Sequence, residues 1–392
     1  MTNDAVPARQ VTVTAWICFL IAALEGYDIQ SLGVASPWII GELGLSPQSL
    51  GLAGSAAMVG LVIGAIIGGW AAERRGPKPV LVWATALFAA CSLLTAYAHS
   101  FESLLAARLF TGIGFGGAMP NLLAVATRLR PGGRHAGMAT AIFCGMPVGG
   151  AGVAFIAQSL GNAEHWRMLF VIGGVLPLLL VPVAWRWMPD LSPVRRAGPG
   201  TGTGNALFGE GRLAATLLIW LGFALALMLL YLLLNWLPLL VIGKGQPPAL
   251  GSRAAFCFNL AAIPGALLLG QLADRRGYRM PIAIATAILL AGLAGLIAAD
   301  GAAAILISAA LLGAASIGMQ YVLYAAVPLL YPAETRIAAA GVAIGVGRLG
   351  SIGGPMLAGW LRQGGYDVNT LLAMLVPIAL VAGGASIAAI RR

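Results

Sequence analysis

Long apolar runs, separated by short polar segments, recur along the whole chain of 392 residues. Each run is close to the roughly 20 residues that an α-helix needs to cross about 30 Å of hydrocarbon. Twelve such runs are present, and each predicts a membrane-spanning helix. They cover residues 12–36, 50–72, 79–98, 102–127, 135–160, 167–188, 213–242, 253–273, 280–299, 302–330, 337–362 and 369–390. The pattern therefore predicts an all-α integral membrane protein with both termini on one side.

The composition indicates the same environment. Hydrophobic residues make up 59% of the chain and charged residues only 9%, with a mean hydropathy of +0.90. A soluble domain has about 25% charged residues, so this chain is expected to be solvated mainly by lipid. The 54 glycines fit this environment, because small residues let helices approach closely in a bilayer.

The net charge of +10 could indicate a nucleic-acid partner, but the positions of the charges argue against one. Of the 23 lysines and arginines, seventeen lie on the side of the predicted membrane that holds the termini, four on the other side and two inside spans. Cytoplasmic loops of membrane proteins carry such an excess of basic residues. We therefore expect both termini in the cytoplasm and no nucleic-acid partner.

The four cysteines lie in apolar spans and lack the spacing of metal ligands. Buried cysteines of this kind act as small hydrophobic residues. We therefore expect no metal site and no cofactor.

An internal repeat is the second strong pattern of the sequence. The segment 69–78, Gly-Trp-Ala-Ala-Glu-Arg-Arg-Gly-Pro-Lys, recurs 201 residues later as the segment 270–279, Gly-Gln-Leu-Ala-Asp-Arg-Arg-Gly-Tyr-Arg. The same offset relates Gly112 to Gly313, Gly117 to Gly318, Pro131 to Pro332, and Gly149 to Gly350. Parallel repeats of this kind are typical of transporters whose halves move about a central site.

The polar stretch at 189–212 is rich in Gly, Pro and Arg and lies at the middle of the chain. Its composition is typical of a flexible linker. We therefore expect a six-helix bundle over 1–188, a cytoplasmic linker over 189–212 and a second six-helix bundle over 213–392. The other loops are too short for an extramembrane catalytic domain, which argues against an enzyme.

Each copy of the repeated segment is a charged hairpin between two spans. The pattern Gly-x-x-x-(Glu/Asp)-Arg-x-Gly resembles the signature loop of the major facilitator superfamily, and a plain topology signal would not require it twice. The segment 104–114 (Leu-x-x-x-Arg-x-x-x-Gly-x-Gly) similarly resembles the fourth-helix motif of this superfamily. The first loop differs from the family pattern at Glu73 and Pro77. The resemblance implies two pseudo-symmetric six-helix bundles and a gating role for Glu73, Arg74, Gly76, Asp274, Arg275 and Gly277.

Four ionisable residues lie inside predicted spans: Glu25, Asp28, Arg108 and Arg348. A charge at the bilayer centre costs about 3 kcal/mol on insertion scales, so each is a candidate functional residue. The repeat does not account for them, because the positions at the same offset hold uncharged residues. The two halves therefore share a scaffold and differ in their charges.

Asp28 and Arg108 are close enough in depth to pair. The helical rise places Asp28 about 12 Å and Arg108 about 8 Å below the same membrane face, a difference that a long arginine side chain can bridge. One interpretation is an ion pair that only fixes helix register. The other is proton coupling, because an acid that moves between a dry and an arginine-paired environment can load and release protons. Glu25, one turn from Asp28 and near the midplane, is a candidate for the same role.

Arg348 lies near the midplane, and its permanent charge and forked guanidinium suit a substrate carboxylate. Polar and aromatic residues of other spans could complete a site in which amides bond a ring hydroxyl and tyrosines flank an aromatic ring. Each could equally connect neighbouring helices. The candidate substrate-binding residues are Arg348, Glu25, Tyr231, Asn235, Asn259, Tyr324, Gln320 and Asn121.

A further resemblance narrows the substrate. The segment 24–28, Leu-Glu-Gly-Tyr-Asp, resembles the first-span motif of the aromatic acid:proton symporter family. Segments 118–121 (Ala-Met-Pro-Asn), 235–240 (Asn-Trp-Leu-Pro-Leu-Leu), 322–325 (Val-Leu-Tyr-Ala) and 347–350 (Gly-Arg-Leu-Gly) fit the same family, so the resemblance covers nearly the whole chain. Glu25, where much of the family has Asp, favours the phenylpropionate-like branch over hydroxybenzoate carriers. The resemblance implies import of an aromatic carboxylate with protons across a bacterial inner membrane, and we expect a monomer.

Other functions stay open at this point. A proton-coupled exporter of hydrophobic compounds would use the same scaffold with antiport of protons. A symporter of another small organic anion would use the same charges. A channel or receptor is disfavoured by the symmetrical glycine-rich halves. A membrane-embedded enzyme would need a nucleophile–base set or a metal cluster within the spans, and the sequence has neither.

Overall fold

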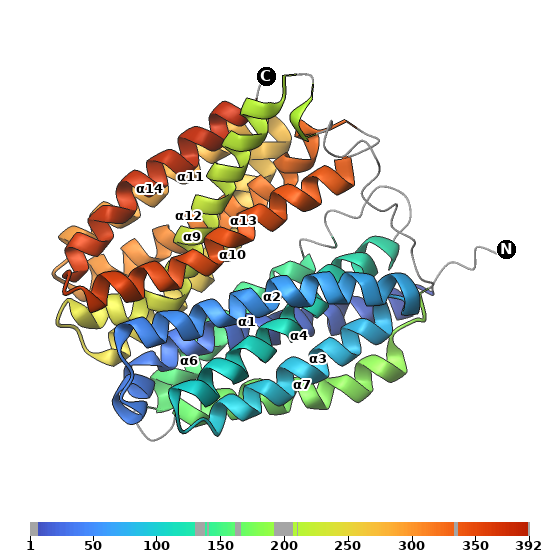
Figure 1. The fold of residues 1–392 in the computed structure, drawn as a ribbon, viewed down its shortest axis with the longest axis horizontal. Helices are drawn as coiled ribbons and strands as arrows, with labels where there is room; N and C mark the ends of the chain where they lie inside the picture. Colours follow the sequence, from blue (N-terminus) through green and yellow to red (C-terminus); the bar gives the residue numbers. More distant parts are fainter. Residues whose placement is uncertain are drawn as a thin grey trace. The chain divides into compact units, whose positions relative to one another are not determined.

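The protein is described by a computed structural model over residues 7–129, 138, 141–160, 166–191, 207–209, 211–332 and 336–390. Over these residues the chain forms twelve α-helices and one short 3₁₀ helix (Figure 1). The first half holds α1 (Ala8–Leu43), α2 (Pro47–Arg75), α3 (Pro77–Ala96), α4 (Phe101–Leu129), α6 (Gly145–Leu160) and α7 (Trp166–Trp187). The second half holds α9 (Leu213–Gly243), α10 (Pro248–Arg276), α11 (Arg279–Ala298), α12 (Ala302–Ala326), η2 (Val327–Leu330), α13 (Arg336–Gln363) and α14 (Val368–Ala389).

Each apolar run of the sequence overlaps one of these helices. Ten helices in the described part of the chain are long and apolar enough to cross a membrane. The two others are α4 and α13, which carry Arg108 and Arg348 together with several glycines that lower their hydropathy. The all-α membrane class predicted from the sequence is therefore confirmed, with ten candidate spans.

Large apolar side chains are exposed on the surfaces of the helices. Ile66 is 70% exposed, Trp83 68% and Leu268 65%. Soluble proteins rarely expose apolar side chains over so much of their surface. Such a surface fits helices that span a membrane.

The helices group into two compact units, the first made of Met1–Leu43 with Ala56–Arg196 and the second of Gly44–Ser55 with Ala197–Arg392. In the first unit, α3 packs on α4 and α7, and α1 packs on α6 and α7. In the second, α11 packs on α12 and α14, and α9 packs on α13 and α14. These are the same helix pairs at equivalent places of the repeat. Most of the expected linker, 192–206 and 210, lies outside the described residues.

The offset of 201 residues also relates individual helix contacts. A Cβ atom on Gly112 of α4 would lie 2.0 Å from the Ala57 carbonyl oxygen of α2. A Cβ atom on Gly313 of α12 would lie 1.9 Å from the Phe258 carbonyl oxygen of α10. The two contacted residues, 57 and 258, are themselves 201 positions apart. The repeated glycines are therefore places where two helices touch so closely that no larger side chain fits.

Gly149 and Gly350 repeat this relation on other helices. A Cβ atom on either would lie 1.7 Å from a carbonyl oxygen, that of Ala23 on α1 or of Ala224 on α9. The contacted residues again differ by 201 positions. Of the repeated proline pair, Pro131 lies outside the described residues.

Candidate functional site

The acidic residues of α1 lie in the interior of the first unit. Glu25 and Asp28 are both fully buried, with 0% exposure. They are three residues apart and therefore lie one helical turn from each other on neighbouring positions of the helix surface. Gly26, between them in the sequence, is where α1 packs on the backbone of α6. A Cβ atom on Gly26 would lie 2.1 Å from the Met146 carbonyl oxygen.

Asp28 and Arg108 form a buried ion pair between α1 and α4. Arg108 Nη1 donates to Asp28 Oδ2 over 2.8 Å, and neither side chain is more than 1% exposed. This confirms the pairing that the depths of the two residues in the sequence predict. Burial makes each member of this pair depend on the other, because removing either partner leaves an uncompensated buried charge.

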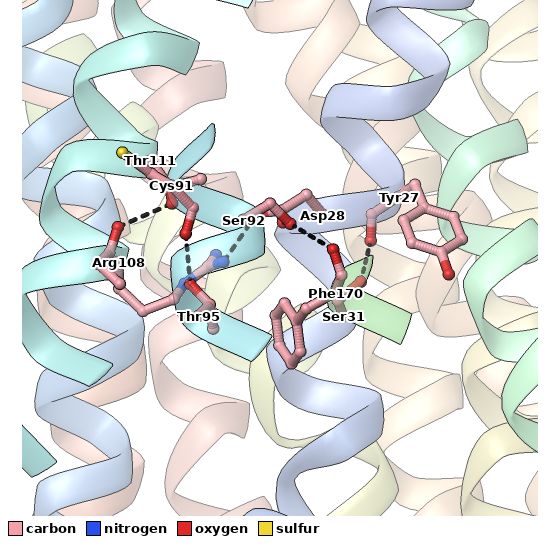
Figure 2. A network of polar contacts seen from close by, with 10 residues as sticks. Tyr27, Asp28, Ser31, Cys91, Ser92, Thr95, Arg108, Thr111 and Phe170 are labelled. Carbon is pink, nitrogen blue, oxygen red and sulfur yellow. Dashed lines mark hydrogen bonds and ion pairs between the residues drawn. The ribbon is translucent and has the colours of Figure 1, made fainter. Parts of the chain in front are cut away.

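The second oxygen of Asp28 is bound by α3. Ser92 Oγ donates to Asp28 Oδ1 over 2.5 Å and lies 3.2 Å from the Phe170 carbonyl oxygen of α7. The Arg108 guanidinium lies 6.0 Å from the centroid of the Phe170 ring. Figure 2 shows Asp28, Ser92, Arg108 and Phe170 together, with dashed lines marking the contacts between them. Four helices, α1, α3, α4 and α7, therefore contribute to one polar network.

The sequence did not predict the roles of Ser92 and Phe170 in this network. A single serine in an apolar span carries no signal, because such a hydroxyl usually bonds a carbonyl of its own helix. An apolar phenylalanine is equally inconspicuous. Both residues were detectable only through the helix packing.

The second unit holds the other buried cation. Arg348 on α13 is 7% exposed, and its Nη1 donates to the hydroxyl of Tyr231 on α9 over 3.1 Å. The hydroxyl fixes the direction of the guanidinium. Two of the residues predicted from the sequence are thus brought together.

Tyr324 lies on α12 in the same unit, with Gln320 one turn before it. Its ring packs edge-to-face on Phe223 of α9, with centroids 5.0 Å apart. Its hydroxyl is buried and has no hydrogen-bond partner within the described residues. A buried hydroxyl of this kind can bind a polar group of a ligand, since burial without a partner costs free energy.

The predicted amides are buried but bond their own helices. Asn235, Asn259 and Asn121 each donate to the carbonyl oxygen four residues earlier, at 2.7–2.8 Å. Asn121 lies thirteen residues beyond Arg108 on α4, which is about 20 Å along the helix. The structure therefore does not bring Asn121 to the Asp28–Arg108 pair.

The two charged hairpins share one backbone conformation. Gly76 and Gly277 have φ angles of 82° and 75°, which glycine adopts without strain. The amide of each donates to the carbonyl four residues earlier, Ala72 or Ala273, over 2.9 Å in both cases. The repeat in sequence is therefore also a repeat of the turn.

The hairpin side chains have different surroundings. The Arg74 guanidinium lies over the Trp70 ring, 3.6 Å from its centroid, and Lys78 forms an ion pair with Asp190 at 2.8 Å. In the second hairpin, burial and then the nearby charge of Asp274 raise the pKa of Tyr278 above its usual value. The first hairpin is thus tied to the end of α7, whereas the second places an acid beside a tyrosine.

Comparisons with known proteins agree with this architecture. Residues 18–355 match the Major Facilitator Superfamily. The chain is 37% identical to the 3-(3-hydroxy-phenyl)propionate transporter of Escherichia coli, over 96% of this chain and 93% of that protein. It is 31% identical to the 4-hydroxybenzoate transporter PcaK of Pseudomonas putida, over 94% and 90% of the two chains. It is 30% identical to the gallate transporter of Pseudomonas putida, over 95% and 91%.

Solved structures resemble the chain at lower identity. The nucleoside transporter NupG matches with a TM-score of 0.76 and 15% identity, over 98% of this chain and 99% of that one. A D-xylose-proton symporter matches with a TM-score of 0.75 and 16% identity, over 97% and 96%. At these identities the likeness concerns the fold alone.

Proposed function

Because the chain belongs to the Major Facilitator Superfamily, we propose that it is a secondary active transporter that imports an aromatic carboxylate of the hydroxyphenylpropionate type by proton symport, with alternating access. The similarity to the 3-(3-hydroxy-phenyl)propionate transporter over nearly the full length of both chains supports this substrate class. We place the protein in the bacterial inner membrane as a monomer with both termini in the cytoplasm. Its twelve helices are twelve spans in two six-helix bundles, 1–188 and 213–392, joined by the linker 189–212.

The observation that carries the proposal is the orientation of Arg348 by Tyr231. A buried guanidinium is a permanent cation in a medium of low dielectric constant, where its attraction for a carboxylate is strong. The Tyr231 hydroxyl, 3.1 Å from Nη1, directs the remaining N–H groups. In this proposal the guanidinium binds the substrate carboxylate.

The aromatic ring of the substrate is assigned to the surface around Tyr324. The edge-to-face pair of Tyr324 and Phe223 offers the geometry that aromatic rings prefer for a third ring. The Tyr324 hydroxyl can donate to, or accept from, a hydroxyl on that ring. Gln320, Asn235, Asn259 and Asn121 are further candidates for polar contacts with the substrate.

Proton coupling is assigned to Glu25, Asp28 and Arg108. With Asp28 ionised, the pair with Arg108 neutralises both charges inside the first unit. A proton on Asp28 cancels the carboxylate charge and weakens its hold on Arg108. Glu25, one turn away on α1, exchanges the proton that accompanies the substrate. The hairpin residues Glu73, Arg74, Gly76, Asp274, Arg275 and Gly277 are assigned to gating.

Transport by purified protein in proteoliposomes tests the proposal. Radiolabelled 3-(3-hydroxyphenyl)propionate is expected to accumulate inside when the outer solution is made acidic, and acidification of the lumen should accompany uptake. Substrate accumulation that does not depend on the imposed pH gradient contradicts proton symport. Proton movement opposite to the substrate would identify an antiporter. If 3-(3-hydroxyphenyl)propionate is not taken up but another organic anion is, the proposed substrate class is wrong.

A further inference from the structure

Ser92 differs from most of the other buried hydroxyls of the helices, because its hydrogen-bond acceptor is a carboxylate on another helix. Most of them donate back to a carbonyl of their own helix, as in Thr14, Ser31, Thr85, Thr95, Thr111, Thr286 and Ser386. Ser92 instead lies between two other helices, 2.5 Å from Asp28 Oδ1 on α1 and 3.2 Å from the Phe170 carbonyl oxygen on α7. A serine in an apolar helix would satisfy its hydroxyl more simply by bonding its own backbone. A buried hydroxyl that bonds a carboxylate on one helix and lies near a carbonyl of another can respond to the charge of that carboxylate.

The two contacts of Ser92 cannot both be donated at once. A hydroxyl has one proton to donate and two lone pairs to accept with. When Asp28 is ionised, the proton of Ser92 goes to the carboxylate, because hydrogen bonds to a charged acceptor are about twice as strong as neutral ones. When Asp28 is protonated at Oδ1, the new O–H can donate to Ser92 Oγ, and the Ser92 proton is then free for the Phe170 carbonyl.

Phe170 also lies next to the other partner of Asp28. Its ring is 6.0 Å from the Arg108 guanidinium, and its carbonyl is the second acceptor of Ser92. The helix that carries it is packed closely on α3, since a Cβ on Gly173 would lie 3.1 Å from Ser92 Oγ and one on Gly174 would lie 2.7 Å from the Ala89 carbonyl oxygen. A change of hydrogen bond at Ser92 therefore acts on the closely packed interface between α3 and α7.

We propose that Ser92 is a positioning residue that transmits the protonation of Asp28 to α7 through the Phe170 carbonyl. The inference rests on the proposed role of Asp28 in proton coupling. One O–H bond forms at Asp28 Oδ1 when the proton arrives. No other covalent bond changes, and the Ser92 hydroxyl rotates from Asp28 to Phe170.

Few other ionisable residues lie near Asp28 and Ser92 in the described part of the chain. On α1 the neighbouring titratable groups are Glu25 and Tyr27, on α3 Cys91, and on α4 Arg108. The nearest ionisable residue of α7, Arg167, forms an ion pair with Glu42 at 2.7 Å. The described residues of α6 include no ionisable side chain. Asp28 is therefore the group whose charge Ser92 senses directly.

Infrared spectroscopy of the protein in lipid tests the switch without any substrate. A pH titration should reveal the C=O band of a protonated carboxylic acid that is absent from Asp28→Asn, or from Asp28→Asn combined with Arg108→Gln should the single variant fail to fold. In Ser92→Ala this band should move to higher frequency, because the acid has lost the partner to which it donates.

Thr95→Val is the matched control. Thr95 lies one turn further along α3, is equally buried and donates to Cys91 of its own helix. The Thr95→Val variant should leave the frequency of the Asp28 band at its wild-type value. Ser92→Cys, which keeps a weak donor of similar size, should give an intermediate shift and replaces Ser92→Ala if the alanine variant does not fold.

Three results would overturn the proposal. The first is the absence of any Asp28 band down to the lowest pH at which the protein remains folded. The second is an unchanged frequency of this band in both Ser92 variants. The third is an equal shift in Thr95→Val, which would indicate a general effect of α3 packing. Because these measurements need no substrate, they are independent of the uptake assay, so failure of the transport proposal can be recognised separately.

Discussion

The carboxylate of Asp28 and the guanidinium of Arg108 are 2.8 Å apart in the interior of the first unit, and both are shielded from solvent. Burial makes the pair dependent on both of its members. Asp28→Leu should destabilise the protein by about 3–5 kcal/mol, because Arg108 is left as a buried charge without its acceptor. Adding Arg108→Met should recover most of this loss.

Thermal unfolding of the detergent-purified variants measures these effects. Asp28→Asn is the matched control, because its amide oxygen still accepts from Arg108, and its loss should be smaller. If Asp28→Leu and the double variant with Arg108→Met unfold at the same temperature, the loss in the single variant does not come from an unpaired Arg108.

The contact between Arg348 and Tyr231 predicts a graded loss of ligand affinity. Arg348→Lys keeps the charge but loses the forked donors, and Tyr231→Phe loses the hydroxyl that directs them. Tyr231→Phe should weaken binding of 3-(3-hydroxyphenyl)propionate about tenfold, the effect of one hydrogen bond to a charged group, and Arg348→Lys should weaken it at least as much. Ligand-induced thermal stabilisation measures both, because it depends on ligand concentration relative to Kd. Arg253→Lys, at an exposed position of α10, should bind as the wild type does.

Glu25 is fully buried one turn from Asp28, and its proposed role is proton exchange. Glu25→Gln preserves the shape of the side chain but can neither bind nor release a proton. We expect uphill accumulation in proteoliposomes to be lost while counterflow exchange of labelled for unlabelled substrate continues. Accumulation at the wild-type level would remove Glu25 from the coupling mechanism.

The equivalent glycines predict equivalent sensitivity of the two halves. Gly112→Ala and Gly313→Ala each place a methyl group about 2 Å from a carbonyl oxygen of the facing helix, and both should destabilise the protein by at least about 1–3 kcal/mol. Gly345→Ala is the control, since a Cβ there meets nothing within 4 Å. It should be neutral or stabilising by up to about 1 kcal/mol, the helix-propensity difference. Yield and unfolding temperature after membrane extraction measure the outcome; tolerance of one glycine variant but not the other would argue against equivalent packing.

The sequence determined where the helices lie along the chain and which helices of the two halves correspond to each other. In lipid every backbone polar group must be satisfied inside its own segment, so an apolar run of sufficient length has to be a helix. The repeated glycines were also recognisable in the sequence. Two helix backbones can touch only where glycine leaves room, so equivalent contacts in the two halves require glycine at equivalent positions. Asp28 and Arg108 could be paired from depth alone, since the rise of a helix fixes how far each lies along its axis.

For the other polar side chains, the tertiary structure alone decided which of them meet. Depth along a helix is linear in sequence, but the direction in which a side chain points depends on how each helix is rotated and packed. That is why Ser92 and Phe170 went unnoticed, whereas Asn121, Asn235 and Asn259 bond their own helices. A hydroxyl or amide in an apolar helix can bond its own backbone or a neighbour with similar energy, and only the packing of α1, α3, α4 and α7 turned Ser92 toward Asp28.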